Sequence, residues 1–140
     1  MKFYIGSSLQ NREAVSWYAQ RLKEHGWEHA YDWTKLEPAA APERLAEIAQ
    51  RERQGVRDAE VVILLLPGGR GTHVELGLAL ALGKKVFLCA GDAEAFAPEN
   101  TVAFYQLPGV VRLAGTDREN LERILECAGP LYPSGMPVGE

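Results

Sequence analysis

Hydrophobic positions along the chain follow two spacings, and one of them is typical of β-strands. Short apolar runs bounded by glycine, proline or polar residues predict the strands of a buried sheet. Aromatic residues at positions 27, 31 and 33 favour a further strand there. The predicted strands are 2–6, 27–33, 60–66, 85–90 and 110–113. The run at 60–66 is almost entirely aliphatic, which indicates a central strand covered on both faces.

The other spacing, with apolar residues three and four positions apart, predicts amphipathic helices between these strands. The first helix is marked by Val15, Tyr18, Ala19 and Leu22. The second is marked by Leu45, Ile48, Ala49 and Val56, and its first turn accommodates Pro42. Residues 72–82 are apolar nearly all round, so we expect a buried helix there, and 117–127 form the last helix.

Strands that alternate with helices indicate a mostly parallel sheet with helices on both faces. We therefore expect an α/β fold, a flavodoxin- or Rossmann-like three-layer sandwich of about five strands. One domain is predicted over 1–128, and residues 129–140, which contain several prolines, are predicted to be a C-terminal tail. Ligands of such sheets bind beyond the carboxyl ends of the strands, which selects the turns at 6–10 and 67–72.

Composition and charge narrow the range of partners. With 140 residues, 46% of them hydrophobic, the chain is long enough for one buried core. A net charge of −4 without a cluster of Lys or Arg argues against a nucleic acid polymer as partner. The longest apolar run, 61–67, is too short to cross a membrane, and charged residues at 12 and 13 come too early for a signal peptide. Cys89 and Cys127 make no disulfide framework, so we expect reduced thiols and a cytoplasmic location.

The strongest local signal is a glycine-rich turn that leads into a helix, Pro67-Gly68-Gly69-Arg70-Gly71-Thr72-His73-Val74-Glu75-Leu76-Gly77. Glycines let the backbone approach a ligand, and the positive end of a helix favours a phosphate or a negatively charged transition state. No Gly-Lys-Ser/Thr follows, so the turn is not a Walker A loop. A dinucleotide fingerprint would follow the first strand instead. The turn therefore predicts a site for an anion.

Glu75 allows two interpretations. The spacing Thr72-x-x-Glu75 fits a capping box, in which Glu75 reaches back to the amide of Thr72. The sheet topology and the glycine turn instead place Glu75 at the expected ligand crevice. The spacing alone favours the cap, whereas the topology favours a functional carboxylate.

Two further residues, Glu52 and Tyr4, are unusual for their positions. Position 52 continues the apolar stripe of its helix, so a carboxylate there lies at the rim, pairs with an arginine or faces a polar pocket. Tyr4 lies within the first strand and either belongs to the core or presents its hydroxyl to the crevice. His25 and His29 are separated by Gly26, and there is no C-x-x-C, so we expect no metal site.

Taken together, these segments resemble the nucleoside 2-deoxyribosyltransferase-like superfamily, which includes deoxyribosyltransferases and nucleotide N-glycosidases. The resemblance covers about residues 2–88 and rests on Phe3-Tyr4-Ile5-Gly6-Ser7, on 55–62 and above all on 71–86. It implies that Glu75 is the catalytic carboxylate and that Tyr4 is the family's first-strand tyrosine. Many members have an aspartate where this chain has Glu52. The active site of the family is often completed by a neighbouring subunit.

Residues 67–75 also resemble the P-G-G-x-G-T-x-x-E motif of the lysine-decarboxylase-like phosphoribohydrolases, which release cytokinin bases. Those proteins are longer and have a glycine-rich first turn that Gly6-Ser7-Ser8 lacks. Both groups cleave N-glycosidic bonds with a glutamate that follows a glycine turn.

The first resemblance implies cleavage or transfer at the N-glycosidic bond of a (deoxy)ribonucleoside or its 5′-monophosphate, with no cofactor and no metal. The catalytic residues would be Glu75, Tyr4 and Glu52. The substrate-binding residues would be Gly6, Ser7, Gly69, Arg70, Gly71 and Thr72. An alternative of another class is a nucleotide-binding module without turnover. Because so short a chain leaves little length for a lid, we also expect a homo-oligomer that closes the site.

Overall fold

The aliphatic run that the sequence places at the centre of the sheet forms β3 (Val61–Leu65). Its residues are all buried in the computed structural model, which describes residues 1–36 and 41–128. Strand β3 pairs in parallel with β1 (Lys2–Gly6) on one side and with β4 (Lys85–Ala90) on the other. The edges are β2 (Glu28–His29) and β5 (Val110–Ala114). The order β2-β1-β3-β4-β5 confirms the predicted flavodoxin-like α/β fold.

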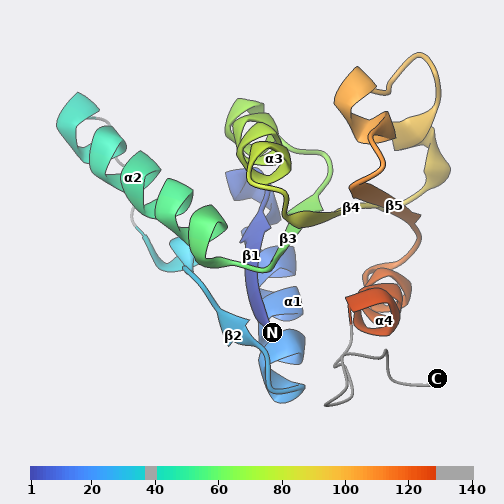
Figure 1. The fold of residues 1–140 in the computed structure, drawn as a ribbon, viewed down its shortest axis with the longest axis horizontal. Coiled ribbons are helices and arrows are strands. Elements are labelled where there is room, and N and C mark those ends of the chain that lie inside the picture. The colour runs from blue at the N-terminus through green and yellow to red at the C-terminus, as the bar shows by residue number, and fades with distance from the viewer. Residues whose placement is uncertain (37–40, 129–140) are drawn as a thin grey trace.

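Helices cover both faces of this sheet, as Figure 1 shows. On one face lie α1 (Arg12–Glu24) and α4 (Asp117–Ala128), which contact each other. On the other face lie α2 (Pro42–Asp58) and α3 (Arg70–Ala81). Pro42 occupies the first turn of α2, as predicted. The strand order reverses between β1 and β3, so the carboxyl ends of these two strands form the switch point at which ligands of such folds bind.

The predicted strand at 27–33 is wrong in its extent. Only Glu28 and His29 pair with β1, and the amide of Ala30 adds one more bond to Phe3. The side chain of Asp32 then accepts a hydrogen bond from the amide of Thr34, which turns the chain into a short 3₁₀ helix at Trp33–Lys35. The aromatic positions of this segment therefore indicate burial against β1, where the Trp33 indole donates to the carbonyl of Ile5 at 2.7 Å, and not a continuous strand.

The helices α2 and α3 are less buried than their sequences predict. Val74 of α3 is 62% exposed and Leu82, directly after α3, is 43% exposed, so this helix is not buried all round. In α2 only the last turns reach the core, where Val56 is fully buried, while Leu45 is 49% exposed. Leu45 is exposed because α2 leans away from the sheet towards its N-terminus, as Figure 1 shows. Apolar side chains on both helices therefore face away from the sheet.

Both cysteines are free, Cys89 buried in β4 and Cys127 exposed on α4. Within residues 1–36 and 41–128, none of the helices has the length and apolar character needed to cross a membrane. The predicted tail at 129–140 lies outside the described residues.

Candidate active site

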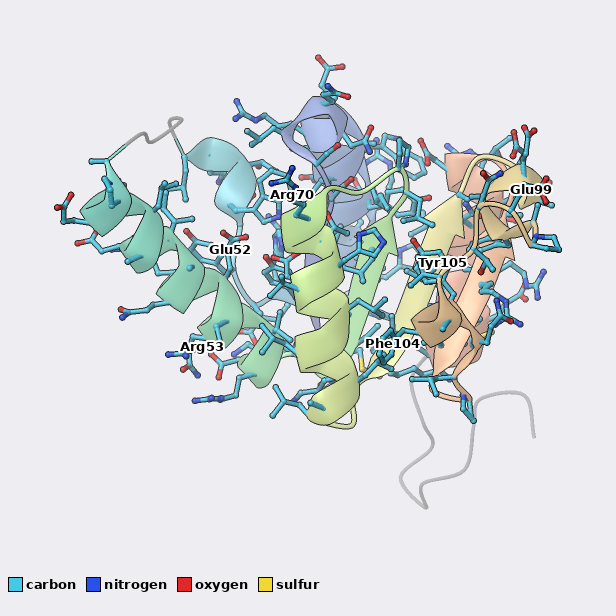
Figure 2. All side chains as sticks on the ribbon, turned by 90° about the horizontal axis from the view of Figure 1, so that it is seen from above. Glu52, Arg53, Arg70, Glu99, Phe104 and Tyr105 are labelled. Carbon is cyan, nitrogen blue, oxygen red and sulfur yellow. The ribbon has the colours of Figure 1, made fainter. Side chains whose placement is uncertain are left out.

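Three side chains from three different elements meet beside the carboxyl half of β1. Tyr4 lies in β1 and is fully buried, and its hydroxyl hydrogen-bonds the carboxyl group of Glu75 from α3. The same hydroxyl lies 3.4 Å from Oε2 of Glu52 on α2. Figure 2 shows Glu52 in the space between α2 and α3. A phenol has one proton, so Tyr4 donates to one carboxylate at a time. Residues distant in sequence, all predicted as catalytic, are therefore in direct contact.

Two glycines make room for this cluster. Gly6 ends β1, and a β-carbon on it would overlap Oε1 of Glu75 and lie 2.8 Å from Cδ2 of Leu64. Gly55, one turn after Glu52, packs its α-carbon against the ring of Tyr4, since a β-carbon there would lie 2.9 Å from Cδ1. Larger residues at either position would displace the carboxylate or the phenol. Gly6 was predicted to bind substrate, and its position under Glu75 makes it a support of the cluster.

The surroundings of Glu75 change its acidity. Glu75 is only 7% exposed, and burial raises the pKa of its carboxyl group to about 8, against an opposing effect of the hydrogen bond from Tyr4 and a further increase from the nearby Glu52. The same burial and the two carboxylates raise the pKa of the Tyr4 phenol above its usual range, so Tyr4 remains a proton donor at neutral pH. The protonated form of Glu75 is therefore favoured to a higher pH than in an exposed glutamate.

The capping interpretation of Glu75 is wrong. Helix α3 begins one turn earlier than a Thr72 cap requires, with Gly69 as the N-cap. Thr72 then occupies the third helical position, and its Oγ1 accepts a hydrogen bond from the amide of Gly69 at 3.2 Å. Glu75 lies in the second turn and points to Tyr4 instead. The hydroxyl of Thr72, predicted to bind substrate, is thus used by the helix cap and is buried.

The glycine turn before α3 is open to solvent. A β-carbon on Gly69 or Gly71 would meet nothing within 4 Å, so a ligand has room to approach the backbone there. The first amides of the helix, among them those of Arg70 and Gly71, have no partner within the helix. Arg70 is exposed at the start of α3, as Figure 2 shows. The turn therefore combines open space with the positive end of a helix, the two features that an anion site requires.

The first turn, after β1, is tied to the end of β3. The hydroxyl of Ser7 donates to the carbonyl of Leu65 at 2.8 Å and accepts from Nδ2 of Asn11, also at 2.8 Å. Asn11 in addition donates to the carbonyl of Pro67 at 3.1 Å. Because its only proton is already used, the Ser7 side chain has no donor left for a phosphate. Asn11, which was not predicted as a site residue, thus joins the two turns together with Ser8, whose hydroxyl donates to the same carbonyl at 3.4 Å.

Two cavities lie away from this cluster. One, of about 270 Å³, is lined by residues of β5 and α4 such as Arg112 and Glu119, and the other, of about 360 Å³, lies between α1 and the segment at Asp32–Lys35. In the part of the chain that the structure describes, no three His, Cys, Asp or Glu side chains gather in an arrangement that suits a metal ion. The arrangement at β1 is therefore the one to compare with known enzymes.

The model of the nucleoside 2-deoxyribosyltransferase family matches residues 3–128. The chain belongs to this family. Among solved structures, that of the CMP N-glycosidase BcmB from Clostridium botulinum shares the fold, with a TM-score of 0.60 and 18% sequence identity. The match covers 89% of this chain and 98% of that one. No sequence among the curated proteins matches.

For this member of the deoxyribosyltransferase family, the match to the family model extends beyond residues 2–88, over which the resemblance is visible in the sequence. It includes residues 89–128, which contain the end of β4, β5 and α4 and in which the sequence shows no motif. Membership supports an activity of the deoxyribosyltransferase or N-glycosidase type. The resemblance in sequence implied an aspartate at position 52. The glutamate that this chain has there reaches the hydroxyl of Tyr4.

Proposed function

We propose that this protein cleaves or transfers the N-glycosidic bond of a (deoxy)ribonucleoside or its 5′-monophosphate, with Glu75 as the catalytic carboxylate. The observation that carries the proposal is the contact of Tyr4, Glu75 and Glu52 at the switch point of the sheet. A buried carboxylate held by a phenol is the arrangement that stabilises positive charge on a sugar. Membership of the family supports the same type of reaction.

The proposed reaction has two steps at the anomeric carbon. In the first, an oxygen of Glu75 bonds to C1′ while the bond from C1′ to the base breaks, and the base leaves with the electron pair and takes up a proton. In the second, water or another base attacks C1′, a proton leaves the attacking group, and Glu75 departs as a carboxylate. Water as the attacking group gives hydrolysis, and a second base gives transfer.

Tyr4 and Glu52 support this chemistry in different ways. The hydrogen bond from Tyr4 orients Glu75 and stabilises its ionised form. Glu52 is only partly buried and lies on the opposite helix, so it is placed to hold a sugar hydroxyl or to protonate the departing base. Glutamate is one methylene longer than the aspartate of many relatives, and the 3.4 Å separation from Tyr4 supports retention of this role.

The substrate-binding part of the proposal uses the backbone more than side chains. The free amides at the start of α3 and the exposed guanidinium of Arg70 would bind a 5′-phosphate, beside the glycines at 69 and 71. Ser7 would contribute its backbone amide, because its hydroxyl proton is already donated to Leu65. We propose that no cofactor and no metal take part.

We further propose a homo-oligomer that forms through the outer face of α3. After Arg70, the exposed side chains of α3 are apolar, an unusual surface for a helix of a monomer. Val74 and Ala81 are exposed on this face beside Gly77, and the exposed Leu82 follows directly after the helix. Phe104 is 60% exposed nearby on the same side of the molecule (Figure 2). We propose that a second copy seated there also closes the site beside α2 and α3. The free thiols of Cys89 and Cys127 support the cytoplasmic location that we propose.

One assay tests the reaction type. The purified protein is incubated with a panel of ribo- and deoxyribonucleosides and their 5′-monophosphates, each with and without an acceptor base, and the released bases are separated by chromatography. Base release without an acceptor identifies a hydrolase, and a new nucleoside formed only with the acceptor identifies a transferase. Faster release from monophosphates would support the phosphate site at the glycine turn.

The assay also separates the alternatives. A non-catalytic nucleotide-binding module would shift its melting temperature with a monophosphate while releasing no base from any member of the panel. Release of free base and ribose 5-phosphate from ribonucleotides alone would narrow the activity to that of a phosphoribohydrolase. Release that persists in the Glu75→Gln variant would contradict the role of Glu75 even if the activity itself is correct.

A further inference from the structure

A chain of hydrogen bonds joins the glycine turn to a segment more than thirty residues later. Nδ1 of His73 lies 2.9 Å from the carbonyl oxygen of Gly69, and Nε2 of the same ring lies 2.7 Å from the hydroxyl of Tyr105, 32 residues on in the sequence. The two rings are also stacked, with centroids 5.8 Å apart. Neither His73 nor Tyr105 belongs to the Tyr4–Glu75–Glu52 cluster.

The partners of His73 determine where its protons lie. A carbonyl oxygen only accepts hydrogen bonds, so Nδ1 carries a proton. In the neutral ring Nε2 is then unprotonated and accepts a hydrogen bond from the hydroxyl of Tyr105. Tyr105 stays protonated for this purpose, since burial raises the pKa of its phenol above the usual range.

Tyr105 is itself held firmly. It is 4% exposed and packs edge-on against Phe96 with ring centroids 6.1 Å apart. The guanidinium of Arg112 on β5 donates to the backbone carbonyl of Tyr105 at 2.6 Å. The phenol is therefore fixed relative to the sheet. Its hydrogen bond in turn holds the ring of His73 in place.

This series of hydrogen bonds ends at the two peptide groups that flank the α-carbon of Gly69. The Gly69 carbonyl accepts from the ring of His73 and also from its backbone amide at 3.3 Å, and the Gly69 amide donates to Thr72. Gly69 has no side chain to hold it in place, and its β-carbon position faces open space. These bonds set the direction in which the following amides, of Arg70 and Gly71, point.

We propose that Tyr105 is a positioning residue that acts through His73 to fix the glycine turn in its ligand-binding orientation. The inference rests on the proposed function, in which this turn receives the phosphate of a monophosphate substrate. Tyr105 touches neither the sugar nor the base. Its loss therefore weakens phosphate binding and leaves the chemical step at Glu75 unchanged.

The first test compares KM and kcat for a nucleoside and its 5′-monophosphate in the Tyr105→Phe variant, which keeps the ring and removes only the hydroxyl. We expect KM for the monophosphate to rise about three- to tenfold, the effect of one lost hydrogen bond, with kcat and the KM of the nucleoside unchanged. The His73→Phe variant should show at least the same rise, and the double variant no more than His73→Phe, because the residues act in series.

The matched control is Tyr18→Phe. Tyr18 is fully buried and donates its hydroxyl to Asp117 at 3.0 Å, between α1 and α4, so the substitution also costs one hydrogen bond but lies on the opposite face of the sheet. We expect it to lower the melting temperature without changing the ratio of the two KM values. An equal rise in KM for nucleoside and monophosphate in Tyr105→Phe, or no rise at all, would overturn the proposal.

The second test does not depend on activity. In ¹⁵N-resolved NMR spectra of the parent protein, His73 should be the Nδ1-protonated tautomer, the less common form of a free imidazole, and it should lose this preference in Tyr105→Phe. Inorganic phosphate should shift the amide signals of Arg70 and Gly71, with weaker binding in the variant. If no base is released from any substrate, the proposed function fails while these spectra still decide the inference; an Nε2-protonated His73 refutes it.

Discussion

The hydroxyl of Tyr4 donates a hydrogen bond to the carboxyl group of Glu75, across 71 positions of sequence, and this bond opposes the increase that burial causes in the pKa of Glu75. Burial favours the protonated carboxyl group, the phenol favours the ionised one, and Glu52 favours the protonated one again. A nucleophilic Glu75 must be ionised, so this balance sets the pH at which the proposed reaction runs.

We predict that kcat/KM for base release rises with pH to a plateau, with a midpoint near the pKa of about 8 of Glu75. The Tyr4→Phe variant loses the bond that favours the ionised form, so its midpoint should move to higher pH. The Glu52→Gln variant loses a like charge, so its midpoint should move to lower pH. The measurement is a pH–rate profile, checked by an NMR titration of the Glu75 carboxyl carbon. The same midpoint in the parent protein and in both variants would contradict this account.

The acidity of Glu75 also predicts how stability depends on pH. In the unfolded chain the carboxyl group loses its proton near pH 4.5, whereas the folded protein keeps it up to about pH 8. The raised pKa therefore stabilises the fold below pH 4.5, and this contribution is lost as the pH rises to 8. Relative to Glu75→Gln, the melting temperature of the parent should fall by about 5 °C or more between pH 5 and 8.

The control for that comparison is Glu122→Gln, which changes an exposed carboxylate on α4 in the same way. Plots of melting temperature against pH for this variant and for the parent should stay parallel over the same pH range. A Glu75→Gln curve parallel to both would show that Glu75 ionises at an ordinary pH.

The contact between Gly6 and Glu75 predicts a large effect of a single methyl group. A β-carbon on Gly6 would overlap Oε1 of Glu75, so Gly6→Ala forces the carboxylate away from Tyr4. We expect base release to fall about a hundredfold or more, since displacing a reacting group by about 1 Å has this effect. Gly91→Ala is the matched control, because a β-carbon there meets nothing within 4 Å. Similar activity of the two variants would contradict the predicted overlap.

The exposed apolar face of α3 predicts a defined assembly. The parent protein should elute as a dimer or larger oligomer in size-exclusion chromatography with light scattering. Val74→Lys places a charge at a position that is 62% exposed, so it should yield monomers with lower activity and an unchanged fold. Gln20→Lys, a charge of the same sign on the exposed face of α1, should leave the assembly intact. A monomeric parent protein with full activity would contradict the proposed oligomer.

The sequence predicted the strands of the sheet well where burial is complete. The ranges 2–6 and 85–90 agree with β1 and β4 residue by residue, because continuous apolar runs bounded by polar residues leave few alternatives. The second strand was overestimated because aromatic spacing reports burial alone, while the Asp32–Thr34 turn depends on a side-chain hydrogen bond that no periodicity reveals. The apolar stripes of α2 and α3 were assigned to the core because a stripe does not say what covers it.

The candidate site was only partly predictable for similar reasons. Tyr4, Glu52 and Glu75 could be selected because each is unusual for its element, and the structure brings them together. Thr72 and Glu75 share the spacing of a cap, but where a helix starts is decided by backbone geometry, and α3 starts at Gly69. Tyr105 lies in a short 3₁₀ helix, Ala103–Gln106, that no sequence motif marks, so its contact with His73 depends on tertiary structure that the sequence does not reveal.

The central claim is that Glu75 performs the chemistry, and base release by the Glu75→Gln variant tests it most directly. The amide keeps the size of the side chain and removes the negative charge, so we predict that release falls about a thousandfold or more, while the melting temperature at pH 5 stays close to that of the parent. Release at a rate near that of the parent would contradict the claim. So would a melting temperature so much lower that loss of the fold alone explains the loss of activity.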